Sequence, residues 1–127
     1  MRFDVLTLFP EFINSYCDCS IIKRAVLSNI IEVNTVNPRD FTYDKHKQVD
    51  DTPYGGGAGM VLMPKPYVEA YESVDKLSKS YTLMMTPQGE PFNNEIAKEL
   101  SEYEQIIILC GHYEGYDERI RAIIKPK

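Results

Sequence analysis

The chain has 127 residues and a mass of 14.6 kDa, which is the size of one typical domain. Hydrophobic residues make up 43% of it and charged residues 26%, so disordered, collagen-like and low-complexity classes are excluded. The formal net charge of −5 at pH 7 argues against a protein that coats nucleic acid through bulk charge. A specific nucleic-acid substrate is still compatible with locally placed positive charge.

The N-terminus and the cysteines indicate the compartment. No apolar run approaches the roughly 20 residues that a membrane span needs, and Asp4 stands where a signal peptide would be apolar. The three cysteines are an odd number, and Cys17 and Cys19 are separated by a single residue. This pattern argues against both a disulfide framework and a zinc site. We therefore expect a cytoplasmic protein that does not associate with a membrane.

The first part of the chain predicts a strand, a helix and a second strand. Arg2–Leu8 is expected to form a buried strand, which Pro10 ends, because it carries the apolar residues Phe3, Val5, Leu6 and Leu8. Apolar residues then recur at helical spacing between Ser20, the expected cap, and Asn29, the expected stop. Ile30–Val36 is rich in β-branched residues and precedes an Asn-Pro turn signal, so it predicts the second strand.

The middle of the chain changes character. From Arg39 to Met63 neither a helical nor a strand period is sustained, and a loop this long inside a compact domain is more often functional than idle. Pro66 is expected to open a helix at its first position, and this helix runs out in the polar stretch Asp75–Ser80. The apolar face of this predicted helix carries Tyr67, Ala70, Tyr71 and Val74.

The last part returns to regular patterns. Tyr81–Met85 and Gln105–Cys110 are continuous apolar runs that predict two more strands. Between them, Asn93 or Asn94 is expected to cap a helix, and Asp117 is expected to cap a last one.

The alternation of strands and helices predicts an α/β fold, with one parallel sheet that helices cover on both faces. Ligands of such sheets bind beyond the carboxyl ends of the strands. The loops expected at that edge are Asp50–Met60, Thr86–Asn94 and Gly111–Tyr116. Neither a repeat nor a linker divides the chain, so we expect one domain.

Four of the five residues from Gly55 to Gly59 are glycine. Glycines let backbone N–H groups approach an anion, but both phosphate-loop patterns fail, because GxxxxGK[ST] is absent and GxGxxG needs a glycine where Met60 stands. Two interpretations stay open: a flexible surface hinge, or a backbone-lined contact for a ligand or substrate, which we favour.

Polar residues gather in the expected edge loops. The stretch TPQG, residues 86–89, follows a buried strand and is either a turn alone or a ligand contact. The stretch CGHYEGYD, residues 110–117, places backbone amides and side chains where they can converge on a ligand. His46, Asp50 and Asp51 match no strict metal-ligand spacing, so we favour polar contacts there over a metal.

Three ungapped blocks carry a resemblance to a known family: HKQVDDTPYGGGAGMVLMP (46–64), MTPQGEPFNN (85–94) and LCGHYEGYDERI (109–120), with the opening MRFDVLTLFPEF. In this order they resemble the bacterial tRNA (guanine-N1)-methyltransferase family, TrmD, from Met1 to about Ile120. The resemblance implies a SPOUT-class homodimer that holds S-adenosylmethionine in a deep trefoil knot. It also implies methylation of N1 of the guanosine 3′ of the anticodon in tRNA.

The same resemblance implies two sets of site residues. The cofactor-binding set is Thr86, Pro87, Gln88, Gly89, Gly111, Tyr113, Glu114 and Gly115. The loop that borders the target base is matched by His46, Asp50, Tyr54, Gly55, Gly56, Gly57 and Gly59. Glu114 is expected to be an electrostatic partner of the sulfonium or of a magnesium ion. At His112 the family often has arginine.

Other family features are expected beyond Lys127. Family members are longer, and their third cofactor loop, their general base, a guanine-positioning arginine and the C-terminal tRNA-binding domain have no match in residues 1–127. We therefore expect these residues to be the N-terminal cofactor-binding part, with an incomplete knot and no methyl transfer on their own. The alternatives are a noncatalytic nucleotide- or RNA-binding module of the same fold, and a functionally silent fragment.

Overall fold

The computed structural model describes residues 1–42, 50–51, 61–62, 64–87, 89–111 and 115–116. Its elements in chain order are β1 (Arg2–Leu6), α1 (Pro10–Cys17), α2 (Ser20–Leu27), β2 (Glu32–Val36), the 3-10 helix η1 (Pro38–Phe41), β3 (Asp50–Asp51), β4 (Val61–Leu62), α3 (Pro64–Glu72), β5 (Ser80–Met84), α4 (Asn94–Leu100), β6 (Gln105–Leu109) and β7 (Gly115–Tyr116).

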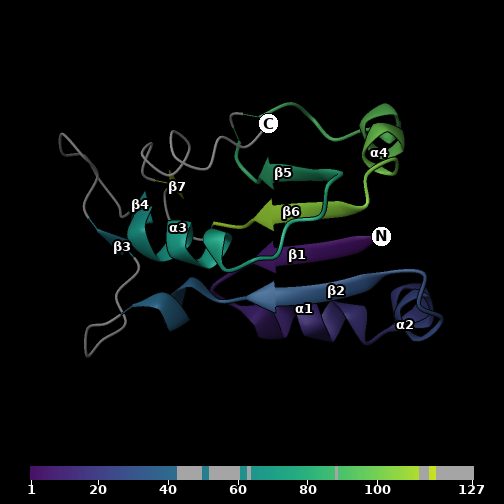
Figure 1. The fold of residues 1–127 in the computed structure, drawn as a ribbon, viewed down its shortest axis with the longest axis horizontal. Coiled ribbons are helices and arrows are strands. Elements are labelled where there is room, and N and C mark those ends of the chain that lie inside the picture. The colour runs from purple at the N-terminus through teal and green to yellow at the C-terminus, as the bar shows by residue number, and fades with distance from the viewer. Residues whose placement is uncertain (43–49, 52–60, 63, 88, 112–114, 117–127) are drawn as a thin grey trace.

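Four strands form one parallel sheet in the order β2-β1-β6-β5 (Figure 1). β1 lies between β2 and β6, so that Leu6 is opposite both Val36 and Leu109. β6 pairs with β5 on its other side, where Leu109 is opposite Met84. Because all four strands run the same way, these four residues mark a common carboxyl edge, as the sequence predicts.

Helices cover both faces of this sheet. Val36 packs against the core that α3 forms with the sheet. Val33 lies on the opposite face, because successive residues of a strand alternate, and it lines a hollow with Val26 of α2 and Cys17 of α1. The predicted α/β fold is therefore confirmed. The buried residues of the α3 core are Leu6, Leu8, Tyr67, Ala70, Val74, Ile107 and Leu109.

α1 is an element that the sequence does not predict. Pro10 is expected only to end the first strand, but it stands at the start of a helix, where a missing N–H costs nothing. The N–H of Phe9 donates to Oγ1 of Thr7 at 3.0 Å, which turns the chain out of the strand. None of the α1 residues is buried, and Phe12 is 69% exposed. Apolar residues do recur at helical spacing in α1, at Phe12, Ile13, Tyr16 and Cys17, but they form no buried face.

The two ends of α2 differ from each other in how well the sequence predicts them. Ser20 is wrong as the cap, because Cys19 occupies that position and its carbonyl accepts the first helical hydrogen bond, from Lys23. The stop at Asn29 is confirmed. Asn29 has a φ of 59°, and the N–H groups of Asn29 and Ile30 bond back to carbonyls of the last turn, as in a Schellman motif.

Two of the helices predicted for the second half are present, with one boundary changed. α3 begins at Pro64 rather than at Pro66, and the expected apolar face is the one that enters the core. Asn93 is the cap of α4, and its Oδ1 accepts a hydrogen bond from the N–H of Ile96 at 2.9 Å. The last helix predicted from Asp117 lies outside the described residues. The three cysteines are all free.

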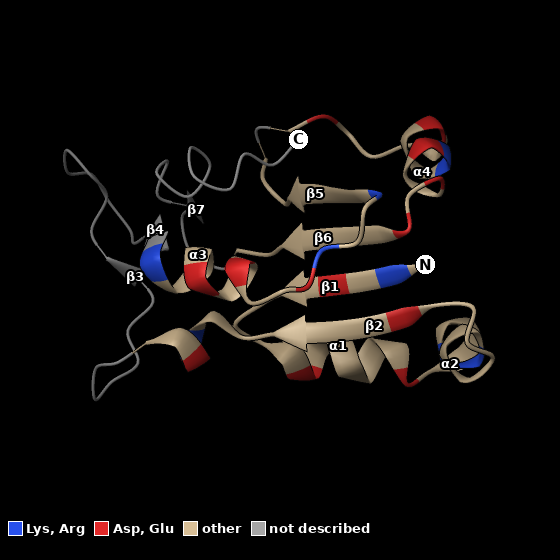
Figure 2. Cartoon of the chain, viewed as in Figure 1, with Lys and Arg blue, Asp and Glu red and all other residues tan. Residues whose placement is uncertain are grey.

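Charge is distributed unequally along the four-stranded sheet. Arg2 and Asp4 lie in the amino half of β1, and Glu32 is the first residue of β2; Figure 2 shows the charge colours at the starts of these two strands. β5 and β6 contain no charged residue, and the carboxyl ends of β1 and β2 are likewise uncharged. The carboxyl edge is therefore neutral and the amino edge is polar.

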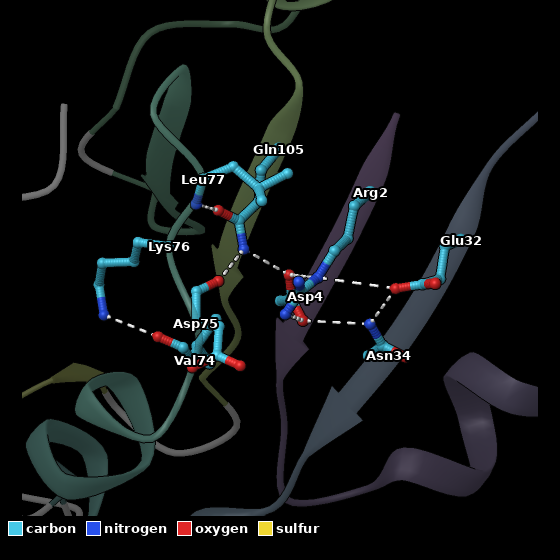
Figure 3. A network of polar contacts seen from close by, with 9 residues as sticks. All are labelled: Arg2, Asp4, Glu32, Asn34, Val74, Asp75, Lys76, Leu77 and Gln105. Atoms are coloured by element: carbon cyan, nitrogen blue, oxygen red, sulfur yellow. Dashed lines mark hydrogen bonds and ion pairs between the residues drawn. The ribbon is translucent and has the colours of Figure 1, made fainter.

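A buried carboxylate organises the polar amino edge (Figure 3). Asp4 is only 2% exposed and accepts hydrogen bonds from Nε2 of Gln105 at 2.7 Å, Nε of Arg2 at 2.9 Å and Nδ2 of Asn34 at 3.3 Å. These donors come from β6, from β1 itself and from β2. A buried carboxylate is tolerated when its oxygens are satisfied in this way.

Gln105 connects the same network to the chain between α3 and β5. This side chain is fully buried; its Nε2 also donates to the carbonyl of Asp75 at 2.9 Å, and its Oε1 accepts from the N–H of Leu77 at 2.8 Å. Every buried side-chain nitrogen and oxygen among the described residues has a partner. The network thus ties the α3–β5 connection to the sheet while α3 packs at the opposite edge.

Candidate functional site

The two predicted cofactor loops leave neighbouring strands at the neutral edge. β5 and β6 pair in parallel, and the N–H of Met85 donates to the carbonyl of Leu109 at 3.0 Å, so the pairing continues one residue past β5. Thr86 follows directly on one side, and Gly111 follows Cys110 on the other. The structure therefore places the starts of both loops beside each other.

The first of these loops begins with a turn. The N–H of Gly89 donates to the carbonyl of Thr86 at 3.3 Å; Pro87 and Gly89 are exposed. A Cβ added to Gly89 would lie 3.5 Å from that carbonyl oxygen and 3.7 Å from Cγ2 of Thr86, which are ordinary contact distances. The described fold thus leaves space for a side chain at Gly89, and its own packing does not require glycine there.

A second, three-stranded sheet brings predicted substrate and cofactor segments together. β3 pairs antiparallel with β4, so that Asp51 is opposite Val61, and β4 pairs in parallel with β7, so that Val61 is opposite Gly115. β3 contains Asp50 of the predicted substrate set, and β7 contains Gly115 of the predicted cofactor set. The sequence does not predict these strands, because two residues show no periodicity.

The start of the second cofactor loop is held from two sides. The N–H of Cys110 donates to the carbonyl of Leu6 in β1 at 2.9 Å, and the carbonyl of Cys110 accepts from the hydroxyl of Tyr67 in α3, also at 2.9 Å. Tyr67 is fully buried. The sequence predicts Tyr67 only as part of an apolar helix face, and no pattern marks its polar contact.

The remaining predicted site residues lie outside the described part of the chain. In the cofactor-binding set these are Gln88, Tyr113 and Glu114. In the substrate set they are His46, Tyr54, Gly55, Gly56, Gly57 and Gly59. Their assignments stay predictions.

The described residues show neither a metal cluster nor a membrane span. Within residues 1–42, 50–51, 61–62, 64–87, 89–111 and 115–116, no group of three or more His, Cys, Asp or Glu side chains is placed to hold a metal ion. No helix in that same part of the chain has the length and the apolar character needed to cross a membrane.

Cys110 gives a chemical probe of the candidate site. Burial raises the pKa of its thiol above the ordinary value, whereas Cys19 is exposed. Because the thiolate is the reacting form, we expect iodoacetamide to alkylate Cys110 more slowly than Cys19 at mildly alkaline pH. The rate at Cys110 should also rise at higher pH in the folded than in the unfolded protein, because burial raises the pKa of this thiol. Peptide mass spectrometry across a pH series measures both rates.

Unfolding supplies the control for this labelling. In concentrated urea the burial of Cys110 is lost, and the two cysteines should react at similar rates. Equal rates in the folded protein at every pH would contradict the buried position of the Cys110 thiol.

The parallel sheet and the two loops that leave its neutral edge define an α/β protein of the class that binds ligands beyond the carboxyl ends of its strands. A comparison with protein families identifies the family within this class. The model of the family described as tRNA (Guanine-1)-methyltransferase TrmD matches residues 1–126, and the chain belongs to this family.

Individual relatives agree with the family match. The chain is 50% identical over 124 residues to a tRNA (guanine-N(1)-)-methyltransferase from Synechocystis. The aligned stretch covers 98% of this chain and 54% of the relative. It is 54% identical over 122 residues to the enzyme of the same name from Staphylococcus haemolyticus. That alignment covers 96% of this chain and 50% of the relative. The chain therefore spans about half the length of the curated relatives it matches.

A solved structure shows the same fold. The crystal structure of tRNA (m1G37) methyltransferase from Aquifex aeolicus matches with a TM-score of 0.86 and 44% sequence identity. The match covers 97% of this chain and 56% of that one. The sheet described above is therefore the sheet of a tRNA methyltransferase fold.

Proposed function

We propose that the protein transfers a methyl group from S-adenosylmethionine to N1 of a guanosine in tRNA, at the position 3′ of the anticodon. Family membership supports the reaction class, and the names of the relatives state the guanine and the tRNA. The structural observation that carries the proposal is the arrangement at the neutral edge. There the β4–β7 pairing joins the end of the second cofactor loop to the segment that follows the glycine-rich stretch.

The described residues fit the nucleoside part of this cofactor. Thr86 and Gly111 leave neighbouring strands, a Cβ at Gly89 would meet Thr86 only at ordinary contact distances, and none of the three is charged. An edge whose strand ends carry no charge suits the neutral hydrogen-bonding groups of an adenine and a ribose. When bound, S-adenosylmethionine supplies an electrophilic methyl group. Thr86–Gly89 and Gly111–Gly115 would hold it, and we propose that the Glu114 carboxylate faces its sulfonium or a magnesium ion.

The target guanine is proposed to lie against the segment that runs from His46 to Gly59. This segment contains Asp50, Tyr54 and the glycine-rich stretch Gly55–Gly59. Methyl transfer requires the guanine N1 to be aligned with the methyl group and to lose its proton. We assign the alignment to this segment, and none of the described residues is proposed as the base.

The complete protein is proposed to be a homodimer with a SPOUT trefoil knot in each chain, and to act on tRNA in the cytoplasm. Large apolar side chains on α1 and α2 support an association surface, because Phe12, Tyr16, Ile21 and Leu27 are each at least 69% exposed. Clusters of exposed apolar residues mark interaction sites more often than isolated ones do.

The decisive experiment uses the complete protein encoded by the gene. Calorimetric titration with S-adenosylmethionine tests cofactor binding, with and without Mg²⁺. Methyl transfer to a tRNA transcript is read as a stop in primer extension, because a methyl group on N1 blocks base pairing. The matched control transcript has adenosine in place of the target guanosine.

We expect cofactor binding and a stop at the target guanosine, with no stop in the adenosine control. Binding of cofactor and tRNA without methyl transfer would favour the noncatalytic RNA-binding module. Binding of neither ligand by a folded protein would overturn the proposed function altogether.

A further inference from the structure

Tyr67 makes a polar contact that its place in the core does not require. The side chain is fully buried among Leu6, Leu109 and the other residues of the α3 core. Its hydroxyl nevertheless donates to the carbonyl of Cys110 at 2.9 Å. A phenylalanine would fill nearly the same volume, so packing alone does not account for the hydroxyl that bonds to the backbone of Cys110.

The peptide groups of Cys110 stand where β6 ends and the second cofactor loop begins. Its N–H is bonded to Leu6 of β1 and its C=O to Tyr67 of α3. The orientation of that carbonyl fixes the peptide plane that it shares with Gly111. The hydroxyl of Tyr67 therefore sets the direction in which Gly111 leaves the sheet.

The far end of the same loop is held by the chain segment that leads into α3. β4 (Val61–Leu62) pairs with β7 (Gly115–Tyr116), and α3 begins at Pro64, directly after β4. The stretch from β4 to Tyr67 thus contacts both ends of the loop. Gly115, which the proposed function assigns to the cofactor, pairs with Val61, and Gly111 of the same set directly follows the Cys110 that Tyr67 contacts.

We propose that Tyr67 is a positioning residue for the cofactor, acting through the Cys110 carbonyl on Gly111. This inference rests on the proposed function. A loop that is already in its binding conformation loses less conformational entropy when the ligand binds. Tyr67 therefore contributes to cofactor affinity without touching the cofactor.

The test compares two Tyr→Phe variants of the same helix in the complete protein. Tyr67→Phe removes the bond to Cys110. Tyr71→Phe removes a hydroxyl that lies 3.2 Å from Oγ1 of Thr82 in β5, away from the second loop. Both variants lose one buried or half-buried hydrogen bond, so they should lose similar stability in urea unfolding.

We expect Tyr67→Phe to weaken S-adenosylmethionine binding about fivefold, as the loss of one positioning hydrogen bond implies, and Tyr71→Phe to leave it unchanged. In steady-state assays the KM for the cofactor should rise by the same factor, while kcat at saturating cofactor and the KM for tRNA stay as in the parent protein. A purely structural role for Tyr67 would not separate these constants.

A second variant at the same position restores the donor. 4-Aminophenylalanine at position 67 keeps the ring and an N–H group near the Cys110 carbonyl, and it should bind the cofactor as tightly as the parent protein. Equal cofactor affinity in the two phenylalanine variants, or no recovery with 4-aminophenylalanine, would overturn the role of Tyr67. A parent protein that binds no S-adenosylmethionine would instead overturn the proposed function.

Discussion

Replacing Asp4 with alanine is expected to lower the free energy of unfolding by about 3 kcal/mol, because breaking a buried charged network leaves its partners unsatisfied. The variant removes the carboxylate that accepts from Gln105, Arg2 and Asn34. Gln105 is fully buried and would be left with an unpaired N–H. Chemical denaturation in urea, followed by circular dichroism, measures the change.

A matched control exists at the rim of the same network. Glu32 lies 3.7 Å from Arg2, and its side chain is 65% exposed. Exposed ion pairs contribute little, so Glu32→Gln should cost at most about 0.5 kcal/mol. Equal losses in the Asp4 and Glu32 variants would contradict the central role that the structure gives to the buried carboxylate.

Replacing Gly89 with alanine is expected to weaken S-adenosylmethionine binding at least tenfold while leaving the thermal midpoint nearly unchanged. The structure accommodates the added Cβ at ordinary contact distances from Thr86, so folding should not suffer. The methyl group would occupy space that the cofactor needs if the backbone of this turn approaches it closely. Calorimetric titration and a thermal melt of the same sample separate the two effects.

The neighbouring Glu90→Ala variant is the control for this turn, since Glu90 is exposed and belongs to neither predicted set. Its cofactor affinity and its melt should both match those of the parent protein. Gly111→Ala is expected to behave like Gly89→Ala, because Gly111 starts the second loop. Parent-like affinity in both glycine variants would remove these two loops from the cofactor site.

The central strands of the sheet were predictable because most of their residues are buried. A continuous apolar run such as Ile106–Leu109 admits few other interpretations, and the face of α3 follows from residues at helical spacing. Pro10 shows the limit of such patterns. The same residue suits the end of a strand or the start of a helix, and none of the α1 side chains that follow it is buried in the core.

The long-range contacts at the two edges of the sheet were not predictable in the same way. Gln105 and Asp4 are 101 residues apart in the sequence, and no local pattern in either strand predicts that their side chains contact each other. Tyr67 has the spacing of a core residue, and a hydroxyl inside an apolar face gives no indication of its partner. The small sheet of β3, β4 and β7 was not predictable, because a strand of two residues is too short to show an alternating pattern.

The position of β6 has a consequence for how the protein folds during synthesis. β1, α1, α2 and β2 can assemble early, because β1 and β2 pair directly. β5 joins the four-stranded sheet only through β6, so it has no place in that sheet until the ribosome has released Leu109. Long-range parallel pairing of this kind is slow. Until then one edge of β1 stays unpaired, and the nascent chain carries an exposed template for aggregation that chaperones must cover.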